Sequence, residues 1–142
     1  MRKFLILCGL LAGGAGGALA QDLNCPASLE VQESPVAPLP EGWTPSTQAG
    51  SRYLAGVSFF DGEPGLQRSL APQQDRPVGR DRVATWEFST DAEPIWMACR
   101  YQDSRVLLSR PLPQTVSRCQ VRYGAGGVLK SVQCTSASKR RP

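Results

Sequence analysis

The feature that most constrains the fold of this chain is the spacing of its apolar residues, which recur at every second position in several separate segments. A period of two is typical of β-strands, whose successive side chains point to opposite faces. No long segment after residue 20 carries a helical stripe. The sequence therefore predicts a mostly β protein, a single small antiparallel sheet or sandwich-like domain built of hairpins. The alternating segments are 29–32, 53–60, 85–88, 95–101 and 106–108.

Two of these segments are long enough to assign a core face and an opposite face. Alternate positions share a face of a strand, so the assignment follows directly from the numbering. The expected pairs of faces are Ile95, Met97, Cys99 and Tyr101 against Trp96, Ala98 and Arg100, and Tyr53, Ala55, Val57 and Phe59 against Leu54, Gly56, Ser58 and Phe60.

The N-terminus has the three parts of a secretory signal peptide: a basic start, an apolar run, and small residues before a cleavage site. Ala18 and Ala20 supply the small residues. The apolar run at 4–11 is well short of the roughly 18 to 20 residues that cross a bilayer, so we expect no membrane span. We expect a periplasmic or secreted protein. The expected boundaries are 1–20 for the cleaved signal peptide, 21–134 for the domain and 135–142 for a flexible basic tail.

Beyond the leader the chain keeps an even number of cysteines, namely Cys25, Cys99, Cys119 and Cys134. In an oxidising compartment such a set is typical of two disulfides. Metal sites usually show close pairs such as Cys-x-x-Cys, and the sequence has none. We therefore expect disulfides rather than a metal site.

The last hairpin indicates how the cysteines pair. Gly126-Gly127 fits a two-residue hairpin turn. That turn would set Cys119 opposite Cys134, within disulfide range, and would leave Cys25 for Cys99. Pairing of Cys99 with Cys119 and of Cys25 with Cys134 remains open, since a longer loop would shift the register. The expected register is Ala125 opposite Val128, Tyr123 opposite Lys130, Val121 opposite Val132 and Cys119 opposite Cys134.

Two stretches, 34–50 and 62–82, are rich in proline, glycine and polar residues and are expected to be irregular. Trp43 lies in the middle of the first stretch. We expect its ring to anchor this loop on the core, with exposure for recognition as the alternative.

The composition argues against several kinds of chemistry. The chain has no histidine, which removes Ser-His-Asp and Cys-His systems and the usual general base near neutral pH. Its formal charge of +4 comes partly from the leader and the tail. The remaining domain is near neutral and offers no electrostatic footprint for nucleic acid. We expect no cofactor.

Paired carboxylates are the remaining route to catalysis, and Asp61 with Glu63 and Asp91 with Glu93 are such pairs. Asp61-Gly62 is also ordinary turn chemistry, in which the aspartate bonds its own backbone and Gly62 takes a positive φ. The second pair falls in a strand connection before Pro94. We interpret both as turns and expect the protein not to be an enzyme.

Large aromatic residues are frequent for so small a sheet, and both faces of the strands are partly apolar. Filling a small core explains most of these rings. If Phe60 or Trp96 is exposed beside the turn at Asp61, that patch is the expected partner contact.

Several elements together resemble a family of small exported proteins of Gram-negative bacteria whose function is not assigned. They are Cys25-Pro26, Gly42-Trp43, Phe59-Phe60-Asp61-Gly62, Trp86, Trp96-x-x-Cys99-x-Tyr101, Leu112-Pro113, Cys119 and Cys134. The resemblance implies a periplasmic or extracellular location. It brings no catalytic residue, substrate or cofactor.

Together these observations predict an exported non-catalytic binding protein, for example an inhibitor or immunity-type protein acting on an envelope-directed enzyme through an inserted loop. Its partner would be a protein of the envelope. The alternative is a structural accessory protein of the cell envelope without an enzyme target.

Overall fold

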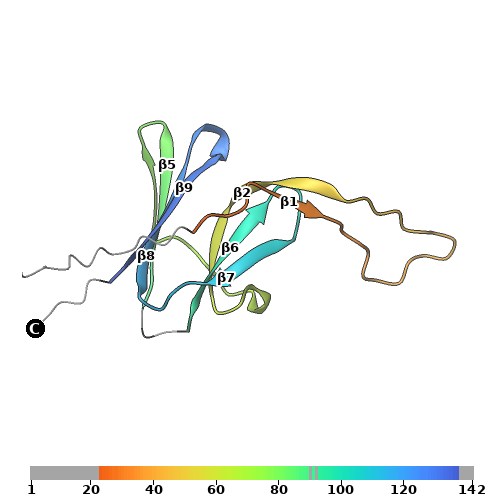
Figure 1. Ribbon diagram of the computed structural model, residues 1–142, viewed down its shortest axis with the longest axis horizontal. Coiled ribbons are helices and arrows are strands. Elements are labelled where there is room, and N and C mark those ends of the chain that lie inside the picture. Colours follow the sequence, from red (N-terminus) through yellow and green to blue (C-terminus); the bar gives the residue numbers. More distant parts are fainter. Residues whose placement is uncertain (1–22, 90, 92, 138–142) are drawn as a thin grey trace, which may run out of the picture.

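A computed structural model describes residues 23–89, 91 and 93–137 and contains two antiparallel β-sheets (Figure 1). The mostly β class is thereby confirmed. The expected signal peptide and residues 138–142 of the expected tail lie outside the described residues. The first sheet has the order β1-β2-β6-β7, with β3 also paired to β2, and the second has the order β4-β5-β8-β9. The strands are β1 (Ser28–Val31), β2 (Gly50–Asp61), β3 (Ser69–Leu70), β4 (Gln74–Val78), β5 (Asp81–Glu87), β6 (Ile95–Tyr101), β7 (Leu107–Pro111), β8 (Val116–Tyr123) and β9 (Leu129–Ser136).

Both sheets contribute to one hydrophobic core. Phe59 of β2 is fully buried, and its ring centroid lies 4.9 Å from that of Trp86 in β5. The Trp86 indole N–H donates a 2.9 Å hydrogen bond to the carbonyl oxygen of Leu70, which satisfies the polar atom of an otherwise apolar ring. The other fully buried large side chains are Met97, Cys119 and Val121.

Met97, Cys99 and Tyr101 of β6 are buried on the predicted core face, and Ala98 on the opposite face is buried as well. The predicted faces of β2 are correct only in its second half. Val57 and Phe59 face the core, whereas Tyr53, expected on the same face, is 62% exposed. The pairing of β2 with β6 slips between Leu54 and Gly56. This bulge at Ala55 inserts one residue, and a one-residue shift exchanges the two faces of a strand.

The predicted turn of the last hairpin is wrong in detail. The connection is longer than Gly126-Gly127 and includes a short 3₁₀ turn, η2 (Ala125–Gly127), closed by a 2.8 Å hydrogen bond from Gly124 N–H to the Val128 carbonyl oxygen. Tyr123 therefore pairs with Leu129 instead of Lys130. A compensating bulge between Arg122 and Tyr123 restores the expected register farther along, so Val121 lies opposite Val132 and Cys119 opposite Cys134.

The two disulfides are Cys25–Cys99 and Cys119–Cys134, with Cα atoms 5.7 and 4.1 Å apart. The alternative, Cys99–Cys119 with Cys25–Cys134, depended on a longer loop that would shift the register of the hairpin. The loop is one residue longer than expected, but the bulge beside Tyr123 compensates for it, so Cys119 still lies opposite Cys134. The first bridge ties the segment before β1 to β6, and the second joins β8 to β9. Such bridges form and persist in oxidising compartments.

Two strands, β3 and β4, were not predicted, and both lie between residues 62 and 82. β4 lies within the stretch 62–82 that was expected to be irregular, and all of its residues are exposed. It contains Pro77, which an edge strand tolerates because its outer N–H groups need no partner. Gly79, with φ of +63°, begins the two-residue connection that joins β4 to β5.

Candidate functional site

The most prominent surface feature is the connection between β1 and β2, residues 32–49, which we call the arm. It extends away from both sheets (Figure 1). Trp43 was expected to anchor this loop on the core. That prediction is wrong, because the side chain is 75% exposed.

The sequence of the arm explains why it stands apart from the sheets. Its four prolines are spread along the segment, and each fixes φ and removes a backbone donor, so the arm cannot join a sheet. At Pro40–Trp43 the chain reverses in a β-turn closed by a 3.2 Å hydrogen bond from Trp43 N–H to the Pro40 carbonyl oxygen. Gly42 has φ of +83°, the left-handed conformation that this position of the turn requires. The turn presents the Trp43 ring to solvent.

Side-chain hydrogen bonds hold the base of the arm. Gln32 donates its amide to the Thr47 hydroxyl at 3.0 Å, which joins the two ends of the arm. Ser104, in the β6–β7 connection, donates to the Glu33 carboxylate at 2.8 Å. This bond, with smaller attractions from Arg52 and Arg105, holds the pKa of Glu33 below its ordinary value of 4.5.

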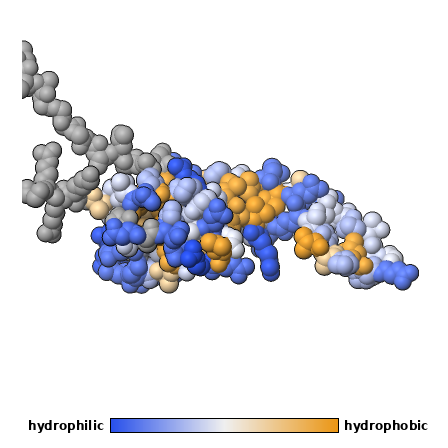
Figure 2. All heavy atoms as spheres, turned by 90° about the horizontal axis from the view of Figure 1, so that it is seen from below, coloured by the Kyte–Doolittle hydropathy of each residue, from blue (hydrophilic) through white to orange (hydrophobic). Residues whose placement is uncertain are grey.

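The arm exposes three apolar side chains: Val36 is 103% exposed, Leu39 41% and Trp43 75%. Figure 2 shows apolar surface on this projecting end of the molecule. The charged residues of the arm are Glu33 and Glu41, with no lysine or arginine. Sequence reasoning missed Val36 and Leu39, which stand between prolines without strand alternation. That isolation from any strand pattern is the signal that could have found them.

A second candidate surface is an open hollow beside Trp96, with a volume of about 460 Å³. Trp96 lies on the outer face of β6, opposite Phe60 of β2 and Pro111 of β7. We call this surface the Trp96 hollow. It is lined by Glu63, Pro64, Gly65, Trp96, Arg105, Leu107 and Ser109.

The structure places the three predicted contact residues close together but with unequal exposure. Phe60 is only 9% exposed and pairs opposite Trp96, while Trp96 is half-buried and lines the hollow. Asp61 follows at the end of β2, where its carboxylate lies 3.5 Å from the Arg68 guanidinium. The expected positive φ of Gly62 is confirmed at +84°. The Asp61 side chain, however, pairs with Arg68 and makes none of the expected bonds to its own backbone among the described contacts.

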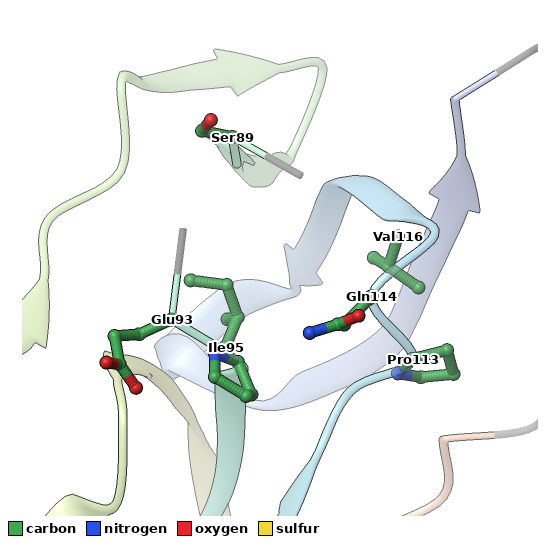
Figure 3. A pocket seen from close by; sticks show the side chains of 7 residues that line it. Ser89, Glu93, Ile95, Pro113, Gln114 and Val116 are labelled. Carbon is green, nitrogen blue, oxygen red and sulfur yellow. The ribbon is translucent and has the colours of Figure 1, made fainter. Parts of the chain in front are cut away.

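The second carboxylate pair also stands in a strand connection. Asp91 and Glu93 are both exposed, and their neighbours Thr90 and Ala92 lie outside the described residues. Glu93 lines a small pocket with Ile95, between the β5–β6 and β7–β8 connections (Figure 3). Its volume of about 10 Å³ is that of a single water, so it offers no room for a substrate.

Across residues 23–89, 91 and 93–137, no three histidine, cysteine, aspartate or glutamate side chains gather closely enough to hold a metal ion. Within these same ranges, no helix has the length and apolar character to cross a membrane.

Comparisons with known proteins identify the family of this chain. The family model described as Type VI secretion system Tli immunity protein matches residues 48–135. The chain is also 34% identical over 128 residues to an uncharacterized 16.3 kDa protein from the trpG 5′ region of Azospirillum brasilense, covering 85% of this chain and 84% of that relative. No solved structure shows significant similarity. That the Phe-Phe-Asp-Gly and Trp-x-x-Cys-x-Tyr elements mark the family stays a prediction.

Proposed function

Because this chain belongs to the Tli immunity protein family of the type VI secretion system, we propose that it is an exported, non-catalytic protein that binds an envelope-directed effector and blocks its activity. The family match is the observation that carries this proposal, since it covers β2 to β9 almost completely. In this role the chain needs a rigid surface complementary to the effector and no reactive group of its own.

We assign the Trp96 hollow to the part of this contact that lies within the family match. Every residue that lines it falls within the segment 48–135 that matches the family. Tryptophan and arginine are enriched where protein interfaces concentrate their binding energy, and the hollow offers both Trp96 and Arg105. Phe60 lies beside Trp96 as its cross-strand neighbour, and Glu63 supplies an acidic group to the lining of the hollow.

Export is the second part of the proposal. Two disulfides in so small a domain support an oxidising compartment, and residues 1–20 have the form of a cleavable leader. We place the mature protein in the periplasm. Fractionation of the native host should recover it there with Gln21 as its first residue. Recovery of the full-length chain in the cytosol, with all cysteines free to react with alkylating reagent, would refute export.

The binding test uses the purified mature chain and, as probe, an envelope-directed type VI effector of the same organism that carries an inactivating substitution. We expect a stoichiometric complex, and we expect Trp96→Ala to weaken it by about 30-fold or more, the effect of losing a hot-spot side chain. Trp96→Phe should restore much of the affinity because it keeps a ring in the hollow. Val78→Ser, on β4 of the other sheet, is the matched control and should bind like the wild type.

Inhibition is tested in cells that receive the active effector in their periplasm. The wild-type chain should protect them, and Trp96→Ala should protect poorly at equal protein level. Recovery of the chain only with peptidoglycan or outer membrane, without any effector complex, would favour a structural accessory role. Turnover of an envelope substrate by the purified chain would contradict the non-catalytic assignment.

A further inference from the structure

We propose that the arm is a plug that enters an apolar, basic-rimmed cleft of the effector and determines which effector this chain recognises. The inference rests on the proposed function, because it names the part of the effector that the arm occupies. It concerns the projecting part of the arm, whose exposed apolar residues do not line the Trp96 hollow. Its support comes from the exposure, stiffness, charge and position of the arm.

Exposure is the first observation. The arm directs Val36, Leu39 and Trp43 into solvent, and none of them belongs to the hydrophobic core or packs against it. A folded domain gains nothing from these side chains. Apolar side chains gathered on one projecting segment are typical of a surface that a partner covers.

The conformation of the arm suits insertion. Its prolines restrict the backbone before binding, and the Gln32–Thr47 and Ser104–Glu33 hydrogen bonds hold its base. A segment that is already ordered loses less conformational entropy when it binds. The turn at Pro40–Trp43 brings Trp43, the type of residue most often found at the centre of an interface, to an exposed position.

Charge indicates the chemistry of the rim. Glu33 is held at the base of the arm by Ser104 and attracted by Arg52 and Arg105, so Glu41, within the turn at Pro40–Trp43, is the negative charge that the projecting part of the arm presents. Interfaces match charges of opposite sign, and this matching mainly raises the association rate. We therefore expect lysine or arginine side chains around the mouth of the apolar cleft.

Position separates the arm from the hollow. Nearly all of the arm precedes residue 48, where the family match begins, whereas the hollow lies entirely inside that match. The shared domain would supply the common contact, and the arm would supply discrimination among effectors.

The test measures the dissociation constant of the mature chain with the same inactivated effector. Trp43→Ala and the double variant Val36→Ser/Leu39→Ser should each weaken binding by about 30-fold or more. Val128→Ser, which alters an equally apolar residue that is 64% exposed at the tip of the β8–β9 hairpin, should leave the constant unchanged. Glu41→Lys should slow association, most strongly at low salt. All of these positions are exposed, so the variants should keep the melting temperature of the wild type.

A second readout follows the Trp43 ring itself. The difference in acrylamide quenching between the wild type and Trp43→Phe isolates the Trp43 signal, and this signal should become protected when effector is added. The plug proposal would be overturned if the wild type binds and both arm variants bind with unchanged affinity. It would also be overturned if the Trp43 ring stays accessible to acrylamide in the complex. Either result would leave the proposed function intact. Failure of the wild-type chain to bind the effector would reject both.

Discussion

The rings of Phe59 and Trp86 lie 4.9 Å apart at an interplanar angle of 55°, and each comes from a different sheet. This tilted contact joins β2 to β5 in the centre of the core. Truncating Phe59 to alanine should lower the free energy of unfolding by about 3 to 5 kcal/mol, because it leaves a cavity between the sheets. Denaturant unfolding followed by far-UV circular dichroism measures this. Phe88→Ala, at a half-buried ring 5.4 Å from Phe59, is the control and should cost clearly less.

A second close approach between the sheets occurs at Gly56. A Cβ atom placed there would lie 2.9 Å from Arg100 Nη2 and 3.2 Å from the Tyr123 hydroxyl oxygen. The arginine can move aside, but Tyr123 is buried. Gly56→Ala should therefore lower the free energy of unfolding by about 1 to 3 kcal/mol through overpacking.

The matched control for Gly56 lies at the start of the same strand. A Cβ atom at Gly50 would meet nothing within 4 Å, so Gly50→Ala should be neutral or stabilise by up to about 1 kcal/mol. Equal effects of the two substitutions on the denaturation midpoint would contradict the close approach at Gly56.

The two disulfides should contribute unequally to stability. They close loops with sequence separations of 74 and 15, and chain entropy alone assigns about 4 and about 3 kcal/mol to them. Replacing Cys25 and Cys99 together by alanine should therefore lower the melting temperature more than replacing Cys119 and Cys134. Peptide mapping of the unreduced protein checks the pairing, and a Cys99–Cys119 peptide would contradict it.

An ion cluster at the β4–β5 and β8–β9 hairpins should make stability depend on pH. Lys130 Nζ and Arg122 Nη1 lie 2.7 and 3.0 Å from the Asp81 carboxylate, and their hydrogen bonds hold the pKa of Asp81 below its ordinary value of 3.8. A lowered folded pKa means that the stabilisation is complete above the ordinary value and disappears as the pH falls through the folded value.

The measurement is the difference in denaturation midpoint between the wild type and Asp81→Asn. We expect a clear difference near pH 6 that shrinks as the pH is lowered below 3.8. Lys130→Gln should remove part of the same pH dependence. A difference that stays constant across this range would show that the cluster does not couple to folding.

The strands that fill the core were predictable because a strand with one buried face carries apolar residues at every second position. In β6 the expected core residues Met97, Cys99 and Tyr101 are buried, although Ala98 between them is buried as well. In β2 the expected core residues Val57 and Phe59 are buried. β4 was missed because it is exposed on both faces, so no alternation marks it. The bulges at Ala55 and beside Tyr123 were also missed, since a single inserted residue leaves the composition of a strand unchanged.

The candidate site was predictable only in part. The sequence marked Trp96, whose ring lines the hollow, and Phe60, which proves to be nearly buried. It misjudged Trp43, because whether a proline-rich loop folds back depends on contacts with distant residues. In this fold the loop leaves between β1 and β2 at the end of the sheet, and no strand of the described domain lies within reach of its turn.

The Cys25–Cys99 bridge allows the sequence and length of the arm to change during evolution without loss of the fold. It fixes β1 to the sheet independently of anything between β1 and β2, so both stems of the arm stay in place whatever sequence joins them. Doubling the length of such a connection costs only about 0.6 kcal/mol in closure entropy. A lineage can therefore exchange this segment for another and retarget the molecule, while its scaffold is inherited intact.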